Sequence, residues 1–270
     1  MKASVASVMA PGLVSYSTSP TDNKTDDGTR LIDTAKSRIA KMQRAVMKGT
    51  QLHGEYQSAY YGKQQAIMAT LTYRKNVEPA AKHISKCMDA VNKWFARKYG
   101  YLPKIVRPQL RYTWVAELTR KGKLHYHVLF FLPPGRKLPM FDRSGFWKHG
   151  MTKLEFARHA SAYMAKYASK GGNGKKLPKG FRMHGSGGFT KDERAERRYH
   201  LAPAWVRMLF SRDMKPKPCH GGGWFSPVTG EFQSSPFFLL SAKAGRVRVG
   251  VFDWFAAYLS QMPQEGETHV

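Results

Sequence analysis

His125 and His127 stand one residue apart in the run Leu124 to Pro133, Leu-His-Tyr-His-Val-Leu-Phe-Phe-Leu-Pro. A short apolar run of this kind predicts a strand, in which side chains two apart point to the same face. Because imidazole is a common metal ligand, the pair indicates a metal site. Two packed histidines with ordinary hydrogen bonds are the alternative, and a third ligand is needed to decide between them.

Glu117 is the candidate third ligand. Residues 111–118 and 124–132 predict two strands joined by a short basic loop, which is the pattern of a β-hairpin. A three-residue loop places Glu117 opposite either His125 or His127 and on their face, whereas a two-residue loop turns it away. Two imidazoles and a carboxylate leave coordination positions open and suit Mg²⁺ or Mn²⁺ better than a closed zinc site.

Two tyrosines could supply a nucleophile. Tyr163 and Tyr167 are four residues apart, so a helix places them on one face, and each is followed three residues later by a lysine, Lys166 and Lys170. A phenol, whose pKa is about 10, is a poor nucleophile at neutral pH. A nearby ammonium favours the phenolate and can neutralise a phosphate under attack. The alternative is an aromatic stripe in the core with the lysines reaching outward.

Apolar periodicity predicts the elements that must position these residues. Helices are expected from Leu31 to about Gly49, from Glu78 to about Lys98, and from the capping-box sequence at 152–155 to Gly171, and a strand over 66–73.

The composition indicates a polyanionic partner. The chain has 45 Lys and Arg against 18 Asp and Glu, a formal net charge of +27, and a hydrophobic content of 42% that is adequate for a core. Cys87 and Cys219 lie far apart without metal-ligand spacing, which fits a reducing cytoplasm. We find no secretory signal and no apolar run of the roughly 20 residues that span a membrane.

Three segments are expected along the chain. Residues 1–29 have no hydrophobic periodicity and predict a mobile tail, residues 30–215 the main domain, and residues 216–270 a C-terminal extension that can pack on the same domain. Within the main domain, the Gly-, Lys- and Arg-rich residues 171–198 predict a basic loop or linker.

Taken together, these motifs resemble those of the HUH endonucleases, and among them the rolling-circle replication initiators of small or filamentous phages and plasmids. His125-Tyr126-His127 is similar to the family's second motif, and Tyr163-Met-Ala-Lys166-Tyr167 to its two-tyrosine third motif. Thr70-Leu71-Thr72 resembles the first motif, a strand of mainly structural use, and the strand that ends in Glu117 resembles the family's acidic metal-ligand strand.

The resemblance implies an α+β fold with a central antiparallel sheet of about five strands, flanking helices and the two histidines on a central strand. It also implies a mechanism. A Mg²⁺ or Mn²⁺ ion held by His125, His127 and Glu117 polarises a phosphate of single-stranded origin DNA. A tyrosine then attacks, which leaves a 5′-phosphotyrosine and a free 3′-hydroxyl, and the strand is later rejoined. The implied partners are a host helicase and a replicative polymerase in the bacterial cytoplasm.

Two other readings of the sequence stay open. A catalytically idle, basic protein that binds single-stranded DNA would explain the charge and the 13% aromatic content. It gives no reason for the histidines, Glu117 and the repeated Tyr-x-x-Lys. A metal-dependent nuclease that uses water would leave the tyrosines unexplained.

Overall fold

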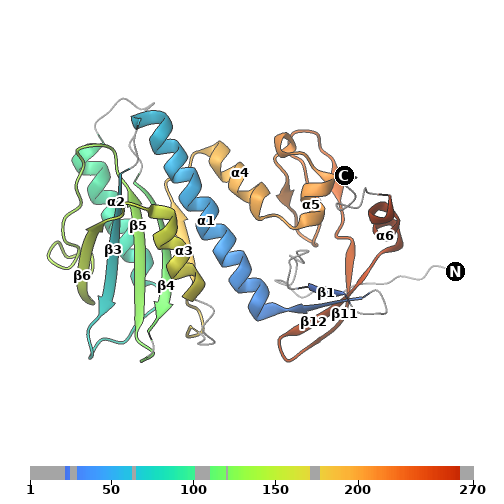
Figure 1. The fold of residues 1–270 in the computed structure, drawn as a ribbon, viewed down its shortest axis with the longest axis horizontal. Helices are drawn as coiled ribbons and strands as arrows, with labels where there is room; N and C mark the ends of the chain where they lie inside the picture. Colours follow the sequence, from blue (N-terminus) through green and yellow to red (C-terminus); the bar gives the residue numbers. More distant parts are fainter. Residues whose placement is uncertain are drawn as a thin grey trace, which may run out of the picture. The chain divides into compact units, whose positions relative to one another are not determined.

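The computed structural model describes residues 22–24, 29–62, 65–100, 110–119, 121–170 and 177–261 (Figure 1). They form two compact units. One comprises residues 39–197, and the other combines the described residues up to Arg38 with those from Arg198 onward. None of the helices in these ranges is both long enough and apolar enough to cross a bilayer.

A five-stranded sheet is the centre of the unit formed by residues 39–197. Its strand order is β6-β3-β5-β4-β7, and each neighbouring pair is antiparallel. The predicted α+β class with a central five-stranded antiparallel sheet is therefore confirmed, as is the central position of the histidine strand β5. The strands are β3 (Ala66–Tyr73), β4 (Arg111–Leu118), β5 (Leu124–Phe131), β6 (Gly150–Phe156) and β7 (His184–Gly187).

Helices cover both faces of this sheet (Figure 1). The α2 face packs against α2 (His83–Tyr99), whose buried stripe is the predicted one. The opposite face, here called the α3 face, packs against α1 (Thr34–Tyr61) and α3 (Ala160–Lys170). Alternation along β5 puts the histidines on the α3 face together with Leu129 and Phe131, as the pattern predicted. The buried residues of α2 are Ile84, Cys87, Met88, Val91 and Phe95.

The first helix differs from the prediction at both ends. It begins at Thr34, because Asp33 Oδ1 accepts the backbone N–H groups of Ala35 and Lys36 at 2.9 and 3.0 Å. Gly49 does not end it. A Cβ atom there would lie 3.2 Å from Thr113 Oγ1, so the glycine lets α1 approach β4 closely. Helix α1 therefore continues to Tyr61.

The predicted helix start at residues 152–155 is wrong, because this segment is the edge strand β6. Thr152 is buried while Met151 and Lys153 are exposed, which is the two-residue period of a strand. The Thr152 hydroxyl donates to Asp142 Oδ1 at 2.7 Å instead of capping a helix. Helix α3 begins only at Ala160, so Tyr163 lies in its first turn.

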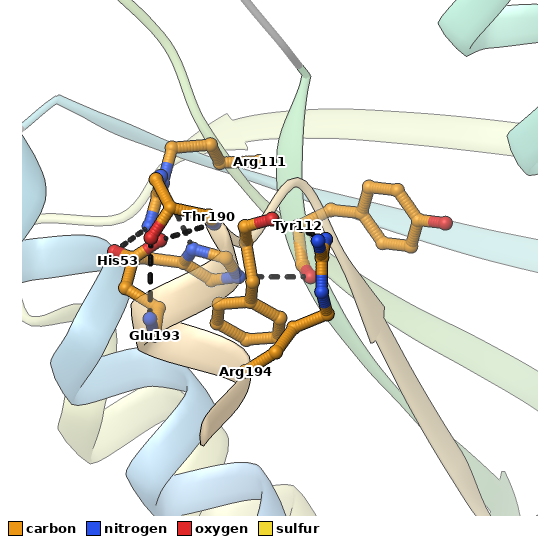
Figure 2. Close-up of polar contacts among 7 residues, drawn as sticks. His53, Arg111, Tyr112, Thr190, Glu193 and Arg194 are labelled. Carbon is orange, nitrogen blue, oxygen red and sulfur yellow. Dashed lines mark hydrogen bonds and ion pairs between the residues drawn. The ribbon is translucent and has the colours of Figure 1, made fainter. Parts of the chain in front are cut away.

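Part of the predicted basic loop is ordered structure, because residues 171–198 contain β7 and most of α4 (Lys191–Leu201). A buried polar network fastens α1 and α4 to β4 (Figure 2). Arg111 on β4 pairs with Glu193 on α4, and its Nε donates to Nδ1 of His53 on α1 at 3.0 Å. Glu193 also accepts the Thr190 backbone N–H at 2.7 Å.

The network fixes the tautomer of His53. A guanidinium can only donate, so Nδ1 of His53 is unprotonated, and Nε2 carries the proton donated to the Tyr112 carbonyl at 3.2 Å. Burial, followed by the charge of Arg111, holds the pKa of His53 well below its usual range. The imidazole is therefore neutral and matches its two partners.

A four-stranded antiparallel sheet with the order β1-β2-β12-β11 is the centre of the second unit. β2 pairs with β12, so residues of the predicted C-terminal extension lie beside residues 30–33. Of the predicted N-terminal tail, β1 and Thr29 are described, and the rest lies outside the described residues. The sheet strands are β1 (Asp22–Lys24), β2 (Arg30–Asp33), β11 (Phe237–Lys243) and β12 (Arg246–Val251).

Shorter elements complete this unit. Helices α5 and α6 contribute Trp205, Val206 and Phe255 to its buried core, which also includes Trp224 and Phe237. Residues predicted as a short amphipathic segment and a closing helix are indeed helical here. The elements are α5 (Ala204–Leu209), a 3₁₀ turn (Arg212–Met214), β8 (Lys217–Pro218), β9 (Trp224–Phe225), β10 (Phe232–Gln233) and α6 (Asp253–Ser260).

Candidate active site

The β4–β5 hairpin has one of the two registers in which Glu117 can reach the histidines. Glu117 lies directly opposite His125. The strands close with the Thr119 N–H donating to the Lys123 carbonyl at 2.9 Å, and Gly122 has a positive φ of 77°. This is a three-residue loop with glycine in the left-handed position, so Glu117 stands on the same face as both imidazoles.

Glu117 makes its closest contact with the other histidine. Its Oε2 lies 2.8 Å from Nε2 of His127, although the backbone pairs Glu117 with His125. Diagonal neighbours on one face of a sheet are within reach of long side chains, which accounts for this contact. The side chains of Glu117 and His127 are 13% and 8% exposed, so the pair is largely shielded from water.

Thr70 contacts the other nitrogen of His127. Its Oγ1 lies 3.3 Å from Nδ1, because Thr70 on β3 pairs with His127 in the sheet. A hydroxyl can donate to Nδ1 or accept from it, so Thr70 can support either tautomer of His127. The sequence indicated a structural use for this strand, and only the register shows that Thr70 orients an imidazole.

The donor chemistry of this corner suits a divalent ion. If Nδ1–H of His127 donates to Thr70, then Nε2 and the Glu117 carboxylate are both electron-pair donors directed at one point. Burial lowers the pKa of His125 despite the opposing charge of Glu117, which keeps that imidazole neutral. Across the described ranges, however, no three His, Cys, Asp or Glu side chains are gathered closely enough to form a metal site. His125 lies opposite Glu117 without joining the pair.

Tyr167 lies directly on the histidine. Its ring stacks on that of His127 with 3.6 Å between centroids and 13° between planes. Tyr167 is half-buried and packs against the apolar core under α3, so the stripe interpretation holds for part of its surface. The stacking also brings this phenol to Glu117 and His127, as the sequence predicted for a nucleophile.

The other predicted residues of α3 lie around Tyr167. Tyr163, one turn earlier, is 37% exposed. The Lys166 ammonium lies 5.9 Å from the centre of the Tyr167 ring. Lys170 is the last residue of α3, and its side chain lies outside what the structure describes.

A further lysine, Lys153, was not predicted because its segment was taken for the first turn of a helix. In β6 it pairs with Thr70, so it stands on the α3 face two strands from His127. The hydrogen bond and charge of Glu155, then the charges of Tyr167 and Tyr163, raise the pKa of Lys153. Its ammonium therefore lies near both phenols, and period-two alternation over 150–156 was the signal for it.

On the other side of β4 the α3 face holds a buried basic pocket. His184 on β7 pairs with Val115, which in turn pairs with His127. Burial lowers the pKa of His184 to about 4, and the charges of Arg197, Arg182 and Lys41 add to the shift. Three buried side-chain atoms have no hydrogen-bond partner among the described residues: Thr113 Oγ1, His184 Nδ1 and Arg197 Nε.

Comparison with known proteins gives one match. A family model of replication-associated proteins, described as the phage-type ORF2 family, matches residues 66–172. This range begins with β3 and ends just after α3, so it contains Glu117, both histidines and both tyrosines. No curated protein and no solved structure matches the chain. The unit that carries the candidate site is thus Rep-like, which supports a role in DNA replication.

Proposed function

We propose that the chain initiates rolling-circle DNA replication by nicking and later rejoining a single strand at the origin. The observation that carries the proposal is the contact of Tyr167 with His127, whose Nε2 meets Glu117. A potential nucleophile and two potential metal ligands thus share one corner of the α3 face. The match to a replication-associated family supports DNA as the substrate.

Glu117, His127 and, after rotation of its side chain, His125 would hold Mg²⁺ or Mn²⁺. Such an ion, when bound, acts as a Lewis acid and template for the scissile phosphate. Thr70 keeps the His127 ring in place by its contact with Nδ1. The low exposure of Glu117 and His127 keeps water from their donor atoms.

A phenol of α3 then attacks phosphorus. The new Tyr Oη–P bond forms as the P–O3′ bond breaks, and the departing 3′-oxygen takes up a proton to become a free 3′-hydroxyl. The phosphodiester energy stays in the 5′-phosphotyrosine bond, so no nucleotide cofactor is needed. Attack by a 3′-hydroxyl on the same phosphorus reverses the step and rejoins the strand. Tyr167 contacts His127, and Tyr163 lies one turn away.

Thr70 offers a sharp test, because it touches His127 without being a proposed ligand. We expect Thr70→Val to slow nicking of an origin oligonucleotide about 10- to 100-fold, the usual effect of losing such a supporting hydrogen bond. Thr70→Ser keeps the hydroxyl and should retain most activity. Nicking is followed on denaturing gels with Mn²⁺, and DNA affinity by fluorescence anisotropy without metal.

His127→Ala should abolish nicking and leave DNA affinity largely intact. A wild-type chain that binds the oligonucleotide tightly but never cleaves it would instead be the non-catalytic DNA-binding protein. Equal nicking by Thr70→Val and the wild type would remove Thr70 from the site.

A further inference from the structure

Half of the α3 face is left open beside the candidate site. The edge strand β6 directs Met151, Lys153 and Glu155 to this face, because their partners on β3 include Thr72 and Thr70. Met151 is 72% exposed, and the Lys153 side chain is 70% exposed. The other half differs: Val115 is fully buried beneath α1 and α3. A ligand can therefore approach the phenols over β6 and β3.

The sheet register places the open residues in line with the site. Lys153, Thr70 and His127 form one row across three strands, and Met151, Thr72 and His125 form the next. Two strand spacings, about 10 Å, separate the backbones of Lys153 and His127. An extended nucleic-acid strand that crosses β3 and β6 with one phosphate at His127 would bring an adjoining phosphate to Lys153.

Lys153 has the chemistry for that phosphate. Its ammonium bonds to Glu155 Oε1 at 2.8 Å in a pair whose side chains are 70% and 49% exposed. Exposed ion pairs of this kind are weak, so a phosphate oxygen can compete for the ammonium. An ammonium has three N–H donors, and Glu155 accepts one of them. Lys153 can therefore contact a phosphate while Glu155 stays close.

Met151 has the chemistry for a base. A single exposed methionine is ordinary, but this one lies on the same face as Lys153 and one residue pair nearer to His125. A thioether side chain is flexible and polarisable and packs well on flat aromatic rings. Each nucleotide next to the scissile phosphate presents one phosphate and one base, which are the two groups that Lys153 and Met151 suit.

We propose that the β6–β3 half of the α3 face binds the nucleotide adjoining the scissile phosphate, with Lys153 on its phosphate and Met151 against its base. This inference rests on the proposed function for the identity of the strand. It adds the side from which the single strand enters, over the β6 edge and away from the half covered by α1.

The test measures binding separately from cleavage. Anisotropy of a labelled, unstructured DNA oligonucleotide is recorded in EDTA over a range of salt concentrations. We expect Lys153→Ala to lower affinity several-fold and to reduce the slope of log K against log salt by about one, the signature of one lost phosphate contact. Lys93→Ala removes an exposed lysine from α2 on the opposite face and should leave the slope unchanged.

The base contact is tested at Met151. Met151→Trp offers a larger stacking surface and should tighten binding, whereas Met151→Ala should weaken it with no change of salt slope. Thermal melts check folding, which these exposed positions should tolerate. Equal slopes for Lys153→Ala and Lys93→Ala would overturn the inference even if the wild type nicks DNA. A lower slope for Lys153→Ala in a chain that forms no adduct would keep the inference and refute the nicking.

Discussion

Removing the carboxylate of Glu193 should cost more stability than most single substitutions. Its partner Arg111 has a side chain only 6% exposed, and Glu193 itself is 15% exposed. In Glu193→Ala the guanidinium would keep Nδ1 of His53 and the Tyr56 ring, 3.8 Å from its centre, but neither carries a negative charge. Breaking a buried pair costs about 3–5 kcal/mol. Because Glu193 is partly exposed, water can replace it in part, and we expect about 3 kcal/mol.

Urea unfolding of the full chain measures the free energy, and hydrogen exchange of peptides from residues 110–119 shows whether the loss falls on β4. Glu55→Ala is the control, since its carboxylate bonds to Gln51 on the exposed surface of α1. It should change stability by less than about 0.5 kcal/mol. Arg111→Met combined with Glu193→Ala should cost less than the sum of the single changes. Strict additivity, or a Glu193→Ala cost equal to that of Glu55→Ala, would refute the reasoning.

Three other predictions concern stability and reactivity. Gly49→Ala should destabilise the chain by about 1 kcal/mol in urea unfolding, because the contact with Thr113 Oγ1 at 3.2 Å outweighs the gain in helix propensity; a stabilised variant would contradict this. Burial lowers the pKa of His184 to about 4, so folding stability should be lost as pH falls from about 6.5 to 4. His184→Gln should lack up to about 3 kcal/mol of that loss, and an unchanged pH profile would count against it. Burial also raises the pKa of the Cys87 thiol to about 12, so a thiol reagent at pH 8 should modify half-buried Cys219 and spare Cys87 until the chain unfolds.

Strand periodicity and hairpin chemistry allowed the centre of the fold to be predicted from sequence. The alternation around His125 and His127 and the glycine of the β4–β5 loop are local signals, and local signals determined both the face and the possible registers. The pairing of Glu117 with His127 rather than His125 could not be predicted, because it depends on how side chains lie diagonally across two strands.

Other parts of the site depended on contacts between distant segments. Thr70 reaches His127 only because β3 pairs with β5, and residues far apart in sequence give no signal for that register. Lys153 was hidden by a capping-box pattern that the sheet overrides when β6 pairs with β3. Gly49 was read as a helix end, whereas its lack of a side chain serves the packing of α1 on β4.

The most direct test of the proposed nicking chemistry is to map the covalent adduct. The chain is incubated with a single-stranded origin oligonucleotide and Mn²⁺, digested, and analysed by mass spectrometry for nucleotide-modified peptides. We expect the modification on Tyr163 or Tyr167 and nowhere else, and its complete loss when both are replaced by phenylalanine. An adduct that persists in the Tyr163→Phe, Tyr167→Phe chain would contradict the account.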